Sequence, residues 1–283
     1  MMKKIGFIDY YLSEWHANNY PAWFNEVCEK NGLSYEVAYA YAEKNVSPVD
    51  GKTTDEWCEK YGVKKCATVK ELCEKSDFVI ILAPTNPETH LKLCKEAFRY
   101  CKGGRMYIDK TFAPDLKTAK EIFSLAKEGD IDFFSTSALR YCSDFNGSKN
   151  VKSITTFYGG SNLEEYIIHQ IESVVKVMAA PADKLKAEKD GETTKYEIMF
   201  KDGRSAFMEF NVNNGYRAKI EYTDGTVTDK NLAPGYFITL SEKILNFFET
   251  GLVDFDKSET LEVMNIRDNA VKAKEETGVW LKL

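Results

Sequence analysis

The residue types around Asp109 and Lys110 point to a ligand site at the end of a strand. This pair follows the short apolar run 106–108, and the helix-start signal Ala-Pro-Asp at 113–115 comes soon after it. In an open α/β sheet, ligands bind at the carboxyl ends of the strands. A charged pair at that place is therefore a candidate site. The alternative is a surface lysine that is simply paired with its neighbour.

A second group has the spacing of an acid–base site on a helix. Glu165, His169 and Glu172 are four and three residues apart, so they share one helix face. An imidazole with a pKa of about 6.5 can take a hydroxyl proton at neutral pH, and a carboxylate beside it can orient the ring. Lys110 could hold the substrate oxygen and stabilise alkoxide charge. Alternatively, isoleucines around His169 mark a buried helix in which hydrogen bonds merely satisfy the ring.

The elements that would position these groups alternate in the first half of the chain. Apolar runs with flanking turn residues predict strands, and longer periodic stretches with caps predict helices. Strands separated by helices in this way indicate a parallel sheet wound on both faces. The predicted strands are 4–9, 35–42, 77–82, 106–108 and 131–135, and the predicted helices are 17–31, 53–61, 69–75, 88–101 and 115–127.

After about residue 150 the pattern changes to that of an α+β domain. A β-rich stretch at 152–158 precedes a long amphipathic helix at 163–178, and helices are predicted at 237–250 and 258–277. Asp-Gly pairs at 202–203 and 224–225 lie between alternating runs and predict hairpins. We expect a doubly wound parallel sheet in residues 1–140 and an open, mostly antiparallel sheet in residues 141–283, with the closing helix able to pack on the first domain.

Composition favours a globular protein whose partner is a small molecule or another copy of the chain. The chain has 283 residues, of which 43% are hydrophobic and 29% charged, and no apolar run approaches the length of about 18 residues that a membrane helix needs. Its net charge of −6 comes from interspersed residues, so neither a nucleic acid nor a membrane is an expected partner. The N-terminus lacks the pattern of a signal peptide, which predicts a cytoplasmic location.

The cysteines and histidines do not form a metal-binding pattern. All seven cysteines lie between Cys28 and Cys142 without a C-x-x-C pair, and their odd number favours reduced thiols. Cys94 and Cys101 fall on the apolar face of a predicted helix, where a buried structural role is expected. With three scattered histidines, no metal site is predicted.

Four motifs in order resemble the glucose-fructose oxidoreductase, inositol dehydrogenase and MocA family (Gfo/Idh/MocA). DFVIILAPTNPETH at 77–90 is similar to the family's D-x-V-x-I-x-T-P-N-x-x-H segment, and Asp109-Lys110-Thr111 resembles its Glu-Lys-Pro. The stretch 158–172 resembles the G-G-x-x-x-D-x-x-x-H-x-x-D helix. The tail 246–278 is similar to the family's closing helices, so the resemblance covers almost the whole chain.

The resemblance implies a Rossmann domain that binds NAD or NADP and a second domain that often joins subunits into a homo-oligomer, here a dimer or tetramer. It implies hydride transfer to or from a sugar, polyol or related hydroxy compound. The family's catalytic Lys, Asp and His carry over as Lys110, Glu165 and His169. The implied cofactor-binding residues are Ile8, Asp9, Pro84, Asn86, His90 and Lys110, and the implied substrate-binding residues are Arg140, Tyr141 and Glu172.

The first turn departs from the family. A dinucleotide fold binds pyrophosphate at G-x-G-x-x-G, but here Asp9, Tyr11 and Glu14 stand at or near the glycine positions. Two of them are acidic and would repel phosphate. Glu43 is a candidate ribose ligand or a solvated loop residue. The NAD(P)-dependent oxidoreductase therefore has two alternatives on the same fold, a catalytically silent metabolite-binding or regulatory protein and a non-redox lyase or isomerase.

Overall fold

The computed structural model of the protein describes residues 2–101 and 103–283, and it divides into two compact units. The first unit runs to Ser135 and includes Phe237–Phe255. The second comprises Thr136–Tyr236 and Asp256–Leu283. The division lies close to the boundary predicted at residue 140, but a helical segment of the second half packs with the first unit.

The first unit is built on a parallel sheet whose strands follow the order β3-β2-β1-β4-β5-β6. The connection between β3 and β4 crosses from one half of the sheet to the other, as in the doubly wound folds. The strands are β1 Lys3–Asp9, β2 Tyr35–Ala42, β3 Lys64–Lys65, β4 Phe78–Ile81, β5 Arg105–Ile108 and β6 Asp132–Phe134. The helices are α1 Trp15–Asn31, α2 Thr54–Tyr61, α3 Val69–Lys75, α4 Pro87–Tyr100, α5 Leu116–Glu128 and α7 Tyr236–Thr250.

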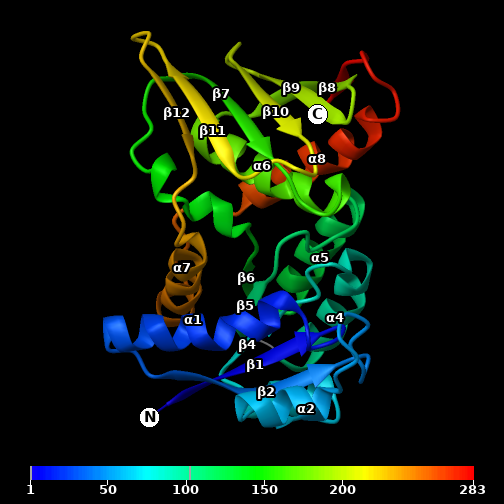
Figure 1. The fold of residues 1–283 in the computed structure, drawn as a ribbon. Coiled ribbons are helices and arrows are strands. Elements are labelled where there is room, and N and C mark those ends of the chain that lie inside the picture. Colours follow the sequence, from blue (N-terminus) through cyan, green and yellow to red (C-terminus); the bar gives the residue numbers. More distant parts are fainter. Residues whose placement is uncertain (1, 102) are drawn as a thin grey trace. The chain divides into compact units, whose positions relative to one another are not determined.

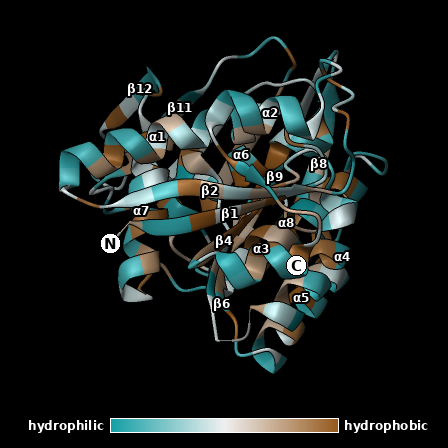
Figure 2. Ribbon diagram, turned by 90° about the horizontal axis from the view of Figure 1, so that it is seen from below, coloured by the Kyte–Doolittle hydropathy of each residue, from teal (hydrophilic) through white to brown (hydrophobic). Residues whose placement is uncertain are grey.

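Successive residues of β1 pack against helices on opposite faces of this sheet. Phe7 packs against Tyr20 of α1 and Trp57 of α2, with ring centroids 6.3 Å apart in both pairs. The next residue back, Gly6, faces α3, where an added Cβ would come within 2.6 Å of Leu72. Figure 2 shows α1 and α2 on one side of the central strands and α3, α4 and α5 on the other. This is the two-sided winding that the sequence predicts.

The second unit contains a mixed, mostly antiparallel sheet in the order β12-β11-β7-β10-β9-β8-β13. The parallel pair in it is β7 with β10. The strands are β7 Val151–Tyr158, β8 Ala182–Asp190, β9 Thr193–Phe200, β10 Ser205–Phe210, β11 Arg217–Tyr222, β12 Val227–Asn231 and β13 Leu281–Lys282. The helices are α6 Leu163–Met178 and α8 Ser258–Ala273, with 3₁₀ turns η1 Ala138–Tyr141 and η2 Ser143–Phe145.

Helices α6 and α8 cover one face of the second sheet (Figure 1). Strand β7 alternates accordingly, because Ile154, Thr156 and Tyr158 are buried while the residues between them are partly exposed. The fold class predicted from the sequence, a doubly wound parallel sheet followed by an open, mostly antiparallel sheet, is confirmed. No helix in the described ranges is long and apolar enough to cross a membrane.

Strand β8 was not predicted from the sequence. Its buried residues are Ala182, Leu185 and Ala187, and a register shift between Ala182 and Lys184 breaks the two-residue alternation. Charged residues fill the other positions, so the segment lacks the pattern of a half-buried strand. Tertiary pairing with β9 and β13 determines its structure.

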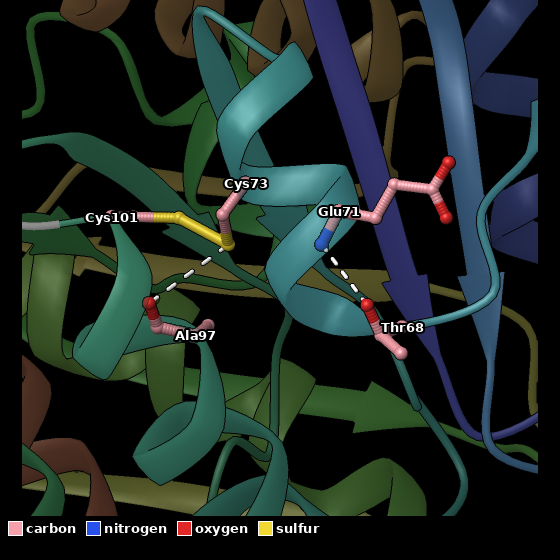
Figure 3. The surroundings of a disulfide bond; sticks show 5 residues. All are labelled: Thr68, Glu71, Cys73, Ala97 and Cys101. Carbon is pink, nitrogen blue, oxygen red and sulfur yellow. Dashed lines mark hydrogen bonds between the residues drawn. A yellow bond between two sulfur atoms is a disulfide. The ribbon is translucent and has the colours of Figure 1, made fainter.

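The prediction of reduced thiols is wrong for two cysteines. Cys73 of α3 and Cys101, the residue that ends α4, form a disulfide with a Cα–Cα distance of 5.5 Å (Figure 3). These residues are 28 positions apart, and packing of α3 against α4 brings them together. The other cysteines are free and buried, including Cys94, as expected for structural thiols.

Candidate functional site

The ends of β1, β4 and β5 bring several predicted site residues together in the first unit. Ile8 is buried near the end of β1, and Asp9 Oδ1 accepts hydrogen bonds from the backbone nitrogens of Tyr10, at 2.7 Å, and Ala83, at 3.0 Å. Lys110 Nζ donates to Pro84 O at 3.2 Å. The carboxyl edge of the parallel sheet is thus lined by polar groups of Asp9, Pro84 and Lys110.

The backbone beside Pro84 and Lys110 is held in an unfavourable conformation. Ala83 has a φ of 62° and Thr111 a φ of 52°, in the left-handed region that side chains with a Cβ seldom occupy. The hydroxyl of Thr111 is also buried without a hydrogen-bond partner in the described ranges. Strain of this kind persists where the surrounding structure fixes it, and it often marks functional sites.

Helix α4 begins beside the same edge. Asn86 is its N-cap residue, but the side chain of Asn86 accepts no backbone N–H of the helix, and its Nδ2 donates to the side chain of Glu88 at Oε1, 3.1 Å away. His90 is fully buried, and burial lowers its pKa to about 4. The ring is therefore neutral at physiological pH. The cofactor-binding roles of Asn86 and His90 stay predictions.

A buried polar cluster connects α1 with the end of β5. His16 Nδ1 lies 2.6 Å from Asp109 Oδ2, and Tyr107 donates its hydroxyl to Asp109 Oδ1 at 3.3 Å. Burial alone would raise the pKa of Asp109, but the adjacent His16 lowers it below its ordinary value. Sequence reasoning placed His16 only among aromatic residues and missed this pair, since the two residues are far apart in the chain.

In the second unit, His169 makes a hydrogen bond at its Nδ1 atom. Ser137 Oγ lies 2.6 Å from this nitrogen, and Ser137 in turn donates its backbone N–H to Glu172 Oε1 at 3.2 Å. All three residues are buried. A hydrogen bond at Nδ1 fixes the orientation of an imidazole and the position of its proton. Ser137 had no motif to identify it in the sequence, because its role depends on η1 packing against α6.

Arg140 and Glu172 form a buried ion pair beside this histidine. Arg140 Nε lies 2.7 Å from Glu172 Oε2, and its Nη1 lies 2.9 Å from Glu259 Oε2. Burial would lower the pKa of Arg140, but the two carboxylates raise it above its ordinary value. The neighbouring Tyr141 is buried, with Lys176 Nζ 5.9 Å from its ring centroid. Contact of these residues with a substrate stays a prediction.

Glu165 lies at the first turn of α6. Its backbone N–H donates to Asn162 Oδ1 at 2.9 Å, and its carboxylate accepts from Asn162 Nδ2 at 3.0 Å. These contacts fasten the start of the helix that carries His169. A catalytic role for Glu165 stays a prediction.

The turn between β1 and α1 does not fit a dinucleotide pyrophosphate. Tyr11, Leu12 and Ser13 are buried, and the Tyr11 hydroxyl lies 3.2 Å from Thr85 Oγ1 in the loop after β4. The carboxylate of Glu14 accepts the backbone N–H groups of α1 that would otherwise face a phosphate. Two like charges 4 Å apart repel by roughly 4 kcal/mol near a protein surface, so an ionised Glu14 would repel a phosphate strongly.

The predicted ribose ligand is also engaged elsewhere. Glu43 Oε1 forms an ion pair with Lys92 Nζ of α4 at 2.6 Å. The loop after β2 is joined to the turn, because Ser13 Oγ donates to Asp50 Oδ2 at 2.9 Å and Ser47 Oγ donates to Ser13 O at 2.7 Å. These contacts engage the side chains of Glu43 and Ser13 within the protein.

Comparison with solved structures supports the fold assignment. The chain is similar to an aldose-aldose oxidoreductase from Caulobacter crescentus complexed with glycerol, with a TM-score of 0.74 and 12% identity over 100% of both chains. It is also similar to an oxidoreductase from Agrobacterium radiobacter in complex with NAD+, L-tartaric acid and magnesium, with a TM-score of 0.75 and 12% identity over 100% of this chain and 98% of that one.

A third similar structure is a dehydrogenase from Clostridium difficile, with a TM-score of 0.72 and 14% identity over 96% of this chain and 99% of that one. No protein-family model matches the sequence, and no curated protein matches it. Identities this low establish the fold alone, and here they do so over the full length. The chain therefore has the fold of the Gfo/Idh/MocA oxidoreductases, as its four sequence motifs predict.

Proposed function

We propose that this protein is a non-redox enzyme that transfers protons on a sugar or related hydroxy compound that carries a carbonyl group, as a lyase or isomerase. His169 is the base in this proposal, and holding the substrate oxygen is the role that the resemblance implies for Lys110. The observation that carries it is the hydrogen bond of 2.6 Å between His169 Nδ1 and Ser137 Oγ, which orients the imidazole on a buried helix. The motif resemblance at both residues and the fold support a small hydroxylated substrate.

The proposed reaction balances without an external oxidant. His169 takes the proton from a carbon next to a carbonyl, and the electron pair of that C–H bond moves toward the carbonyl oxygen. The enolate charge that forms there needs a cation beside it, which is the role that the resemblance implies for Lys110. Return of the proton to the former carbonyl carbon, with transfer of the hydroxyl proton of the α-carbon to the other oxygen, gives an isomer. Departure of a β-hydroxyl as water, with the proton that His169 took up, gives an elimination product.

Proton exchange with solvent tests this proposal across the whole substrate class. The full chain is incubated with a panel of keto-sugars, aldoses and keto-acids in D₂O, without nicotinamide, and loss of the α-proton signal is followed by NMR. We expect exchange with a member of the panel, a fall of about 100-fold or more in His169→Ala, and a smaller fall in Ser137→Ala.

The control is Tyr166→Phe, which keeps the ring whose centroid lies 5.6 Å from that of His169 and removes only the hydroxyl. Unchanged melting temperatures in His169→Ala and Ser137→Ala show that the helix is intact. Exchange that proceeds at the wild-type rate in folded His169→Ala contradicts the proposal.

An NAD(P)-dependent oxidoreductase is the second candidate, favoured by the likeness of fold to oxidoreductases, one of them bound to NAD+. The finer prediction of hydride exchange with a sugar or polyol belongs to this candidate. It requires residues 11–14 to leave their buried positions. Turnover that depends strictly on NAD or NADP would favour it over proton transfer.

A further inference from the structure

We propose that the carboxylate of Glu14 takes the place of a bound phosphate at the N-terminus of α1. The turn between β1 and α1 therefore keeps its structure without a nucleotide. Glu14 precedes the helix, and its two carboxylate oxygens accept from consecutive amides. Oε2 accepts from His16 N at 2.8 Å, and Oε1 accepts from Ala17 N. A phosphate seated on a helix N-terminus binds the same kind of amide pair.

The residue type supports this assignment. Caps of helices are usually Ser, Thr, Asp or Asn, whose short side chains reach a single amide. In this protein, Thr53, Thr68 and Asp115 cap α2, α3 and α5 in that way. Glu14 differs because its longer side chain folds back and uses both oxygens, and because it is 6% exposed. The cap of α1 is thus a buried carboxylate that offers two acceptor oxygens, as a phosphate would.

The surrounding cluster disfavours a further anion. Burial raises the pKa of Glu14, and burial together with Glu14 raises the pKa of Asp9 well above its usual range. The ring nitrogen of His16 points to Asp109, the third carboxyl of the cluster. Asp9 Oδ2 is buried and has no hydrogen-bond partner in the described part of the chain. An added dianion would meet these carboxyls, whereas Glu14 brings a single charge that can be protonated.

Two side-chain contacts hold the turn that precedes Glu14 against the loops on either side of it. The Tyr11–Thr85 contact closes the turn over the loop after β4, and the Ser13–Asp50 hydrogen bond closes it over the loop after β2. Because Tyr11 and Ser13 flank Leu12 and precede Glu14, the turn cannot open without losing both contacts. The domain therefore keeps the fold of a nucleotide-binding protein while its phosphate position is filled.

Removal of the carboxylate tests the proposal. We expect Glu14→Ala to lower the melting temperature by about 2–6 °C, the loss of one helix cap in a chain of this size. Inorganic phosphate or acetate, added at millimolar concentration and constant ionic strength, should then raise the melting temperature of the variant along a saturating curve. The wild type should show no saturable response, because its own carboxylate occupies the amides.

Asp115→Ala is the matched control. It also removes a carboxylate cap in the first unit, but Asp115 is half-buried and its Oδ1 accepts from Thr118 N at 2.7 Å. A response equal to that of Glu14→Ala would show a general salt effect and overturn the proposal. So would a wild type that binds phosphate as tightly as Glu14→Ala does.

Glu14→Gln covers the case in which Glu14→Ala does not fold. Glutamine keeps the length of the side chain but offers one acceptor oxygen, so we expect a smaller loss of stability and a weaker response to phosphate than in Glu14→Ala. A glutamine variant as stable as the wild type would overturn the proposal, because the second oxygen would then contribute nothing.

Discussion

Single side chains decide what this fold can do. Motifs surround His169 and Lys110 in the sequence and make them candidates, but their partners could not be named. Ser137, which holds His169, and His16, which holds Asp109, come from distant parts of the chain and match no pattern. The acidic turn residues were visible as departures from a glycine motif. That Glu14 caps α1 with both oxygens needed the structure.

His90 gives the first prediction at this scale. Its pKa is about 6.5 in the unfolded chain and about 4 in the folded protein, because burial disfavours the charged ring. The unfolded state therefore binds a proton first as the pH falls. The contribution of the neutral ring to the free energy of unfolding is fully present above pH 6.5. It is lost as the pH falls to 4, a decrease of roughly 3 kcal/mol.

His90→Leu should flatten this part of the pH dependence. Urea unfolding of wild type and variant at several pH values measures the difference. Raised pKa values at Asp9 and Glu14 act in the opposite direction, since those groups take up protons earlier in the folded state, but they are common to both proteins. If the free energies of unfolding of wild type and His90→Leu change in parallel between pH 6.5 and pH 4, the role of His90 is refuted.

Elements position the site through a few tight junctions. Helix α6, which carries His169, starts after the turn that follows β7, and Gly159 lies in that turn. An added Cβ there would meet Asn214 O at 2.3 Å and Asn211 O at 2.7 Å. The Gly-Gly pair is recognisable in the sequence as a strand break, but the close backbone approach that requires glycine becomes visible only when the loop at 211–214 is in place.

We expect Gly159→Ala to destabilise the protein by about 2–3 kcal/mol, because backbone oxygens cannot move as a flexible side chain would. Gly215→Ala is the control, since no atom lies within 4 Å of its added Cβ, and its effect should stay within about 1 kcal/mol. Chemical denaturation measures both. Equal stabilities of the two variants would show that the turn adapts.

The disulfide between Cys73 and Cys101 fastens α3 to the end of α4. Because the two residues are 28 positions apart, the cross-link should contribute about 3–4 kcal/mol by limiting the unfolded chain. Thiol titration of the unfolded, unreduced protein should find five thiols, and seven after reduction. Reductant should lower the melting temperature of the wild type but not of the Cys73→Ala, Cys101→Ala double variant. Seven thiols before reduction would contradict the cross-link.

At the scale of the whole molecule, periodicity and turn signals were sufficient to predict the fold class. The buried strands of the first unit read as continuous apolar runs, and α3 and α6 were predicted at their observed bounds. Strand β8 was not predicted, because its bulge and its charges conceal the alternation of buried and exposed residues. The disulfide was not predicted, because it depends on helix packing. Assembly into a dimer or tetramer stays a prediction, which light scattering can test.

The central claim is that an oxidoreductase fold persists here with its phosphate position filled by the chain itself. Isothermal titration of the wild-type protein with NADH and NADPH tests it most directly. The account predicts no saturable heat at millimolar concentrations of either nucleotide. Saturable binding of NADH or NADPH below the millimolar range would contradict the account.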